Sequence, residues 1–261
     1  MYYILQILVL NTPKFVLNFI ILVINECICY DITLVVPAGN YYTVAQELEH
    51  VCSWTEQINL KLNKFKSREI VIYRNNVKNL TIKLPLPHEN ITQVRNLKIL
   101  GVEFDERMNF NLHVEKKICS AANKFYPIKI LKSRGLSSPS IWDVTQAKII
   151  SSLMYASPAW SGFINAESQL RLEALLKKFK RLGFLPGNFK TFGALCADID
   201  ANLFEQIIHA RDDHVLGQFL PEVRDSGHNL RPRSHNLTLP KIVNSMDKKN
   251  FIIRMLYKNM Y

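Results

Sequence analysis

The chain has 261 residues, of which 48% are apolar and 21% are charged, and it carries a formal net charge of +11. This length and composition allow a substantial core in one large or two smaller domains, which excludes a disordered tail. The five cysteines are odd in number and scattered, a pattern typical of reduced intracellular thiols rather than of a metal site. We therefore expect an intracellular protein, in the cytoplasm or the nucleus.

The positive charge is concentrated in the middle of the chain. Residues 113–190 contain 13 Lys and Arg against 4 Asp and Glu, whereas residues 1–112 and residues 191–261 each carry a net charge of +1. Such a block attracts polyanions, and nucleic-acid phosphate is the commonest intracellular partner of this kind. A solvated, highly charged helical surface is the alternative that composition leaves open.

Residues 1–28 form an apolar leader. Their purest apolar run, residues 15–24, contains Asn18 and is shorter than the roughly 20 residues that a membrane span needs. No Lys or Arg precedes Lys14, although a signal peptide carries positive charge ahead of its apolar segment. The sequence favours a buried or unstructured leader, and a membrane-anchored or secreted protein that uses this segment is the alternative.

A strand and a helix are the first elements predicted after this leader. Residues 34–36 form a short apolar strand that Pro37 ends. A helix should begin at Thr43, with Gln46 in the spacing of a capping box. Apolar residues at steps of three and four over residues 44–58 place one mostly apolar face on this helix.

Three further strands are predicted before the chain becomes helical. Residues 69–73 and 80–84 are rich in β-branched and apolar residues and are joined by an Asn-rich turn. Residues 97–105 should form the third strand, in which Gly101 indicates a bulge or a close backbone approach. An ordinary hairpin glycine is an equally open interpretation of Gly101.

Helices are predicted over the basic region. The apolar spacing predicts a helix over residues 114–128, which Pro127 should kink or end early. Ser138 and Pro139 have the order of an N-cap followed by proline, and the helix that they begin should close at Pro158.

A third helix carries much of the positive charge. Asn165 is its expected N-cap and Gly183 its expected end. Its outer residues include Lys177, Lys178, Lys180 and Arg181. Trp142 and Trp160 are expected in the core rather than as platforms on which bases stack.

The last third of the chain should contain short helices at residues 203–210 and 214–219, followed by a polar stretch. Its histidines are His209, His214, His228 and His235. Because no tetrahedral set of Cys and His accompanies them, we expect exposed loop histidines rather than a metal site.

Several short motifs occur in an order typical of one enzyme family. Val-Val-Pro-Ala at residues 35–38 is followed by Trp54, by Asn-Leu-Lys-Leu-Asn-Lys-Phe-Lys-Ser at residues 59–67, by Leu-Gly-Val-Glu-Phe-Asp at residues 100–105 and by Tyr-Ala-Ser-Pro-Ala-Trp at residues 155–160. With these motifs and its ending at residues 250–258, the chain resembles the reverse transcriptases of non-LTR retrotransposons of the jockey type.

The resemblance implies an α+β fold. A partial palm-type antiparallel sheet with one helix would be followed by a mainly helical thumb and C-terminal region. The implied boundaries are an apolar leader at residues 1–28, a partial palm at 29–108, a helical basic thumb at 109–190 and a C-terminal helical and irregular segment at 191–261. The leader does not resemble the palm and fingers that the family would place there.

The catalytic hairpin departs from the family pattern. If Val-Pro-Ala is aligned, Asp31 holds the second aspartate position of a Tyr-Ala-Asp-Asp hairpin and Tyr30 replaces the first. The ancestral enzyme is implied to use Mg²⁺, which needs several converging oxygen ligands, and a neutral phenol is a poor one. Asp31 is at most a vestigial catalytic and metal ligand, and no cofactor is expected here. We therefore expect a truncated, inactive remnant of an RNA-directed DNA polymerase.

The resemblance and the basic block together give candidate nucleic-acid-binding residues. We expect non-specific, phosphate-mediated binding to RNA or DNA, with no small-molecule substrate and no membrane partner. The candidates are Lys61, Lys64, Lys66, Gly101, Lys116, Lys117, Lys177, Lys178, Lys180 and Arg181.

Overall fold

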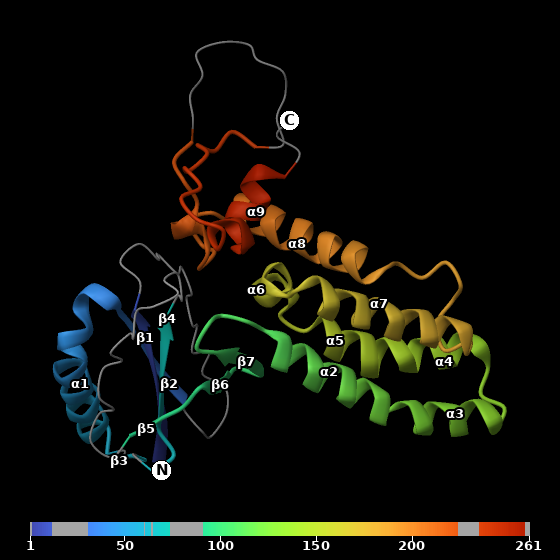
Figure 1. The fold of residues 1–261 in the computed structure, drawn as a ribbon, viewed down its shortest axis with the longest axis horizontal. Helices are drawn as coiled ribbons and strands as arrows, with labels where there is room; N and C mark the ends of the chain where they lie inside the picture. The colour runs from blue at the N-terminus through green and yellow to red at the C-terminus, as the bar shows by residue number, and fades with distance from the viewer. Residues whose placement is uncertain are drawn as a thin grey trace, which may run out of the picture. The chain divides into compact units, whose positions relative to one another are not determined.

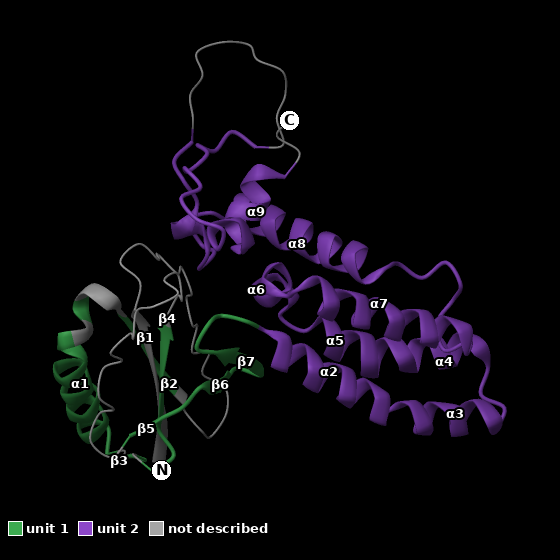
Figure 2. Cartoon of the chain, viewed as in Figure 1, with its two compact units in different colours: residues 1–109 green, residues 110–261 purple. Residues whose placement is uncertain are grey.

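The chain divides into two compact units, residues 1–109 and residues 110–261 (Figure 2). The structure, a computed structural model, describes residues 2–11, 31–59, 61–63, 65–73, 91–223 and 235–258. Most strands belong to the first unit and most helices to the second, so the chain is a mixed α+β protein (Figure 1). The strand predicted at residues 80–84 lies outside the described residues.

The first unit is built on a parallel sheet. Its strands are β1 (Tyr2–Asn11), β2 (Asp31–Pro37), β3 (Lys61–Leu62), β4 (Arg68–Tyr73) and β5 (Thr92–Gln93). β2 and β4 flank β1, β3 also pairs with β1, and β5 pairs with β4, in every case in parallel. The antiparallel sheet implied by the family resemblance is therefore wrong for these strands. Parallel strands need a crossover connection, and α1 (Val44–Gln57) supplies it between β2 and β4.

The central strand β1 comes from the apolar leader. Sequence alone predicts a buried or unstructured segment here, whereas residues 2–11 pair with strands on both sides. Strands of parallel sheets typically have near-continuous apolar sequences instead of an alternating pattern. Residues 2–11 have such a sequence, interrupted by Gln6. The rest of the leader, residues 12–30, lies outside the described residues. Within the described part of the chain, no helix has the length and apolarity to cross a membrane.

The helix α1 packs on this sheet (Figure 1). Leu48 of α1, Val71 of β4 and Ile91 form a buried apolar cluster between helix and strands. This confirms the predicted apolar face of the helix. Thr43 precedes α1, but its hydroxyl donates to the Asn40 carbonyl at 2.8 Å and accepts no N–H of the first turn. The predicted capping box is therefore wrong.

The only antiparallel pair of named strands among the described residues is a hairpin of β6 (Asn96–Ile99) and β7 (Val102–Asp105). At its turn, Leu100 and Gly101 have φ angles of 46° and 84°, the pair of positive values that a tight two-residue hairpin turn requires. The single strand predicted over this stretch is therefore wrong. Gly101 is a hairpin glycine, which is the alternative that the sequence left open.

The second unit is mainly helical. Its helices are α2 (Asn111–Asn123), α3 (Phe125–Ser133), α4 (Ser138–Thr145), α5 (Ser151–Met154), α6 (Ser157–Trp160), α7 (Ala166–Arg181), α8 (Phe192–His209) and α9 (Phe251–Tyr257). A π-helical turn, Gln146–Ile150, joins α4 to α5. Single 3-10 turns lie at Ser161–Phe163, Gly217–Phe219 and Asp247–Lys249.

The helix predicted over residues 114–128 is broken as expected. α2 ends before Lys124, and Pro127 lies in the first turn of α3. Proline is tolerated there because the first N–H groups of a helix have no intrahelical acceptor. This confirms the prediction for Pro127.

The boundaries of α4 and α5 differ from the prediction. The N-cap is Ser137, whose hydroxyl accepts the Ser140 N–H at 3.4 Å, one residue before the predicted start. The helical run ends at Met154, and Pro158 lies in the first turn of α6 instead of closing the preceding helix. Trp142 of α4 is half-buried.

Both predicted ends of α7 are confirmed. The Asn165 side chain accepts the Ser168 N–H at 2.7 Å, which is an N-cap bond. At the other end, Gly183 has a φ of 69° and donates to the Lys180 carbonyl at 2.9 Å. The next N–H, that of Phe184, reaches back to the Phe179 carbonyl at 2.9 Å, which completes a Schellman motif.

The Tyr-Ala-Ser-Pro-Ala-Trp motif forms a tight turn around a buried indole. Ala156 takes a left-handed conformation with a φ of 54°, and Trp160 is fully buried. The indole N–H donates to the Tyr155 carbonyl at 3.0 Å. His113 of α2 contacts the ring edge-on at 5.2 Å, and Phe192 of α8 stacks on it at 6.0 Å. Trp160 therefore belongs to the core, as predicted.

The helix α8 begins well before the predicted residue 203, and α9 packs against it in a separate apolar cluster. His235 lies in this cluster and is buried. Its Nδ1 accepts the Leu237 N–H at 3.2 Å, so its Nε2 carries the proton and donates to the Leu256 carbonyl at 2.9 Å. The prediction of exposed loop histidines is thus wrong for His235, although His209 is exposed.

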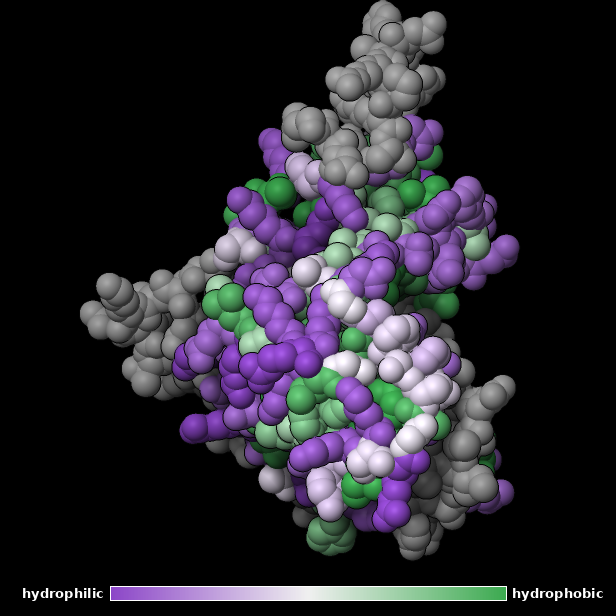
Figure 3. Space-filling model, turned by 90° about the vertical axis from the view of Figure 1, so that its right-hand side faces the viewer, coloured by the Kyte–Doolittle hydropathy of each residue, from purple (hydrophilic) through white to green (hydrophobic). Residues whose placement is uncertain are grey.

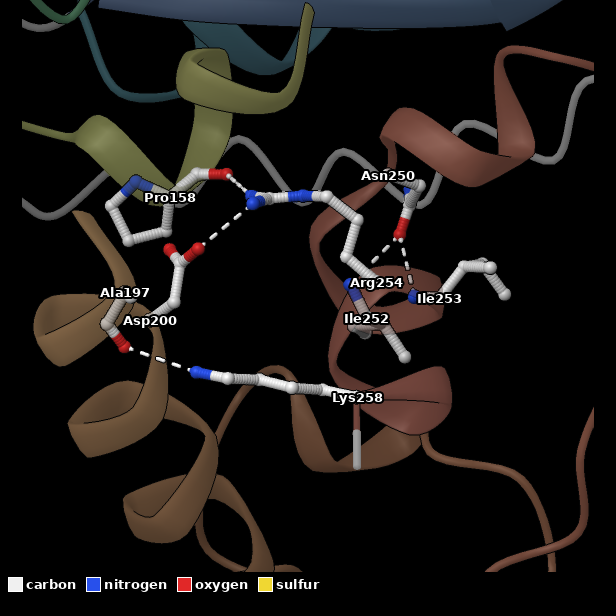
Figure 4. Close-up of polar contacts among 8 residues, drawn as sticks. All are labelled: Pro158, Ala197, Asp200, Asn250, Ile252, Ile253, Arg254 and Lys258. Atoms are coloured by element: carbon white, nitrogen blue, oxygen red, sulfur yellow. Dashed lines mark hydrogen bonds and ion pairs between the residues drawn. The ribbon is translucent and has the colours of Figure 1, made fainter. Parts of the chain in front are cut away.

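Arg254 of α9 ties the C-terminal segment to α8 and α6 (Figure 4). Its guanidinium donates to the Asp200 carboxylate at 2.8 Å and to the Pro158 carbonyl at 3.3 Å. The Asp200 side chain is only 4% exposed, so the guanidinium compensates a buried charge. The same segment packs closely on Gly162, where an added Cβ would lie 2.3 Å from the Lys249 carbonyl oxygen.

We expect Arg254→Met to destabilise the second unit by about 3 kcal/mol, because it leaves a buried carboxylate without its partner. Urea unfolding followed by circular dichroism measures this change. Glu205→Gln is a matched control, since Glu205 lies on α8 beside an exposed histidine and its side chain is 70% exposed. An equal loss of stability in the two variants would contradict the role of Arg254 as the partner that stabilises the buried Asp200 carboxylate.

The deficit in the free energy of unfolding of Arg254→Met, relative to wild type, should depend on pH. Burial raises the pKa of the Asp200 carboxyl, and the nearby guanidinium partly offsets that rise. Without Arg254 the pKa rises further. A group with a raised folded-state pKa stabilises fully below its unfolded pKa and loses that contribution as pH rises through the folded value. The deficit should therefore be largest at neutral pH and shrink in mildly acidic buffer.

Candidate nucleic-acid interface

The candidate residues of the first unit lie at the sheet and its loops. Asp31 is the first residue of β2, level with Ile4 of β1, and Lys61 begins β3, level with Tyr2 of β1. Lys66 is exposed in the turn before β4. Tyr30 and Lys64 lie outside the described residues.

The described residues of the first unit include no cluster of metal ligands. Magnesium needs several oxygen ligands that converge from different elements. In the part of the chain that the structure describes, no three His, Cys, Asp or Glu residues lie close enough together to hold a metal ion.

Several lysine ammonium groups of the second unit are hydrogen-bonded to backbone carbonyls. These bonds join Lys117 to Ser152 at 2.8 Å, Lys124 to Lys148 at 2.8 Å, Lys132 to Leu182 at 2.6 Å, and Lys180 to Phe189. Ser152 lies in the last turn of α5 and Leu182 directly follows α7. Carbonyls at a helix C-terminus lack an intrahelical donor and carry partial negative charge, so an ammonium group there is favourable. The candidates Lys117 and Lys180 therefore contribute to the fold itself.

Three lysines of this region lie over aromatic rings, and one of them is Lys117, whose ammonium lies 5.3 Å from the ring centroid of Tyr155. The Lys178 ammonium lies 4.8 Å from the ring centroid of Phe125, and that of Lys132 lies 5.8 Å from the ring of Phe184. An ammonium within about 6 Å of a ring centroid is attracted by the negative face of the ring. The candidate Lys178 is exposed as well, so it can also reach a ligand.

The remaining cations lie on two neighbouring helices. Phe125 of α3 contacts Phe179 of α7 at 5.9 Å and Phe184 at 5.1 Å, so α3 packs beside the C-terminal half of α7. We define the α3–α7 basic surface by the exposed residues Lys129, Arg134, Lys177, Lys178 and Arg181. Neither residues 116–142 nor residues 174–197 contain an Asp or Glu, so this surface has no carboxylate of its own segments to neutralise it.

Lys116, the remaining candidate, is exposed on α2. Its neighbour Glu115 lies 4.0 Å from Arg171 of α7, so positive charge on that side is partly balanced. The structure thus distributes the candidates of the second unit unevenly. Lys177, Lys178 and Arg181 belong to the α3–α7 basic surface, whereas Lys117 and Lys180 bond to carbonyls.

Sequence reasoning missed the cations of α3. Lys129 and Arg134 were not candidates, although they lie in the longest acid-free stretch of the basic block. That stretch, together with the predicted helix around Pro127, is the signal that could have found them.

The chain matches no protein-family model, no curated protein sequence and no solved structure.

Lys132 and Lys129 allow a direct test of the two kinds of lysine. Lys132→Met should destabilise the second unit by about 1 kcal/mol, because the Leu182 carbonyl loses its donor while the apolar contact with Phe184 is kept. Lys129→Met, on the same helix, should leave the free energy of unfolding within about 0.5 kcal/mol of wild type. Urea titrations measure both, and equal losses would contradict the distinction.

Proposed function

We propose that this chain binds RNA or DNA through the α3–α7 basic surface, without sequence preference. The observation that supports the proposal is a set of exposed cations on α3, directly after it, and on the C-terminal half of α7. The chain has no Asp or Glu in the two stretches that carry them, residues 116–142 and 174–197. Phosphate contacts supply most of the affinity in non-specific nucleic-acid binding, and they need only positive charge at the surface.

We further propose that the chain is a remnant of a reverse transcriptase of the jockey type and has no polymerase activity. The order of the motifs supports the ancestry, and the replacement of the first aspartate by Tyr30 supports the loss of activity. In this proposal the second unit corresponds to the thumb and the C-terminal segment together, and the protein acts in the cytoplasm or the nucleus. The parallel sheet of the first unit is not the arrangement that the ancestry implies, so the proposal of binding rests on the second unit.

The salt dependence of binding tests the proposed surface. Each phosphate neutralised on duplex DNA contributes about 0.9 log units of affinity per log unit of salt. Lys177→Gln combined with Arg181→Gln should therefore flatten the slope by about two units, if both side chains contact phosphate. Fluorescence anisotropy with labelled duplex DNA at a series of salt concentrations measures the slope.

Two controls accompany this measurement. Lys180→Gln should leave the slope unchanged, because the Lys180 ammonium is bonded to the Phe189 carbonyl. Lys241→Gln combined with Lys248→Gln removes the same charge from exposed positions outside the surface. If this second pair flattened the slope as much as Lys177→Gln with Arg181→Gln, binding would depend on net charge alone and the surface would be wrong.

Restoring the missing aspartate should not restore polymerase activity. Tyr30→Asp creates two adjacent carboxylates, but phosphoryl transfer with two metals also needs a carboxylate from a separate strand. Ahead of Tyr30 the sequence offers only Glu26, on the same local segment. Primer extension on an RNA template with Mg²⁺ or Mn²⁺ compares wild type with the variant. Nucleotide incorporation by either protein would overturn the assignment as an inactive remnant.

A further inference from the structure

Apolar side chains reach the surface on α3, beside the basic surface. Tyr126 is 70% exposed, whereas Ile130, Leu131 and Leu136 are each between 37% and 39% exposed. Tyr126 and Ile130 are four residues apart, so they are neighbours on one face of the helix. Figure 3 looks onto the end of the unit where α3 leads into α4, and it shows hydrophobic residues among hydrophilic ones.

The exposed fractions separate one side chain from the others. The exposed fraction of each of the three aliphatic residues is little more than half that of Tyr126. Tyr126 stands out from the helix, and Lys129 is its neighbour three residues on. The group that projects is therefore a flat aromatic ring with a polar tip and a cation beside it.

Charge limits what can cover this face. From residue 116 to residue 142 the chain has six Lys and Arg and no Asp or Glu. A second copy of the same face would oppose like charges, so the partner must be anionic. An anionic membrane would be bound by protruding aliphatic side chains, and here the aliphatic side chains are much less exposed than the Tyr126 ring. A polyanion with exposed aromatic faces suits a lone projecting ring better.

We infer that Tyr126 stacks on an unpaired base, so that the ligand of the α3–α7 basic surface is single-stranded nucleic acid. The inference rests on the proposed function and adds to it the class of ligand. In a duplex both faces of each internal base are covered by neighbouring bases, whereas a single strand presents base faces to an aromatic side chain. The cations hold the backbone while the ring contacts a base.

The test compares the full-length protein with Tyr126→Ala and Tyr126→Phe. Labelled oligo(dT) and a duplex of the same length serve as probes in fluorescence anisotropy. Stacking by one aromatic residue corresponds to a loss of about fivefold or more in affinity when the ring is removed. We expect Tyr126→Ala to bind oligo(dT) with an affinity lower by this factor and to bind the duplex with the affinity of wild type. The dependence of the affinity on salt should not change. Tyr126→Phe should bind as wild type does, since the ring stacks without the hydroxyl.

Tyr42→Ala is the matched control, because Tyr42 is 74% exposed and lies in the first unit. If Tyr126→Ala bound oligo(dT) like wild type, or lost equal affinity for both probes, the inference would be wrong while the basic surface could stand. If wild type bound neither probe, the proposed function itself would fail. Loss by Tyr126→Ala of binding to phosphatidylserine vesicles, with oligo(dT) binding unchanged, would identify a membrane contact and overturn the inference.

Discussion

The second unit depends on the burial of one indole at a turn that has little freedom. Trp160 lies at the end of a segment in which Ala156 takes a left-handed conformation, and a non-glycine residue there costs on the order of 1 kcal/mol. The burial of the ring between α2 and α8 offsets that cost, since His113 and Phe192 contact it from these two helices. From the same turn the Pro158 carbonyl accepts from the C-terminal segment. Contacts at this one turn therefore join α6 to α2, α8 and α9.

The positive charge of the second unit has two uses. Lys132 and Lys180 donate to the backbone carbonyls of Leu182 and Phe189. A charge count includes both lysines, although both stabilise the fold. Lys177 and Arg181 project from α7 next to them and are available to an anion. A charge count over residues 113–190 gives the sum of both kinds. Hence the part of the block that can bind phosphate is smaller than the net charge indicates, and it is confined to two helices.

Features that depend on neighbouring residues, such as helix ends, could be predicted from the sequence. Features that depend on residues far away in the sequence, such as strand pairing, could not. Asn165 and Gly183 mark the two ends of α7, as predicted. Each end is decided locally, because the Asn165 side chain and the left-handed Gly183 backbone satisfy hydrogen-bonding groups only a few residues away. Residues 2–11 were predicted as part of a leader, because their own sequence does not show that β2 and β4 will pair with both edges of the segment. Gly101 was ambiguous because a bulge and a hairpin turn both favour glycine. In the candidate site, the commitment of Lys180 could not be predicted, as its acceptor lies in the following loop.

The Arg254 contacts also bear on the order in which the protein can fold during synthesis. They connect α9 to Asp200 and Pro158, which precede Arg254 by 54 and 96 positions in the sequence. The buried Asp200 carboxylate therefore lacks the Arg254 guanidinium until α9 has emerged from the ribosome. Until then the apolar cluster that α9 completes is open to solvent. Nascent chains that stop short of this helix would expose both features to chaperones and proteases. Docking of α9, the last helix of the described chain, thus completes the burial of the apolar cluster and the pairing of Asp200 in the second unit.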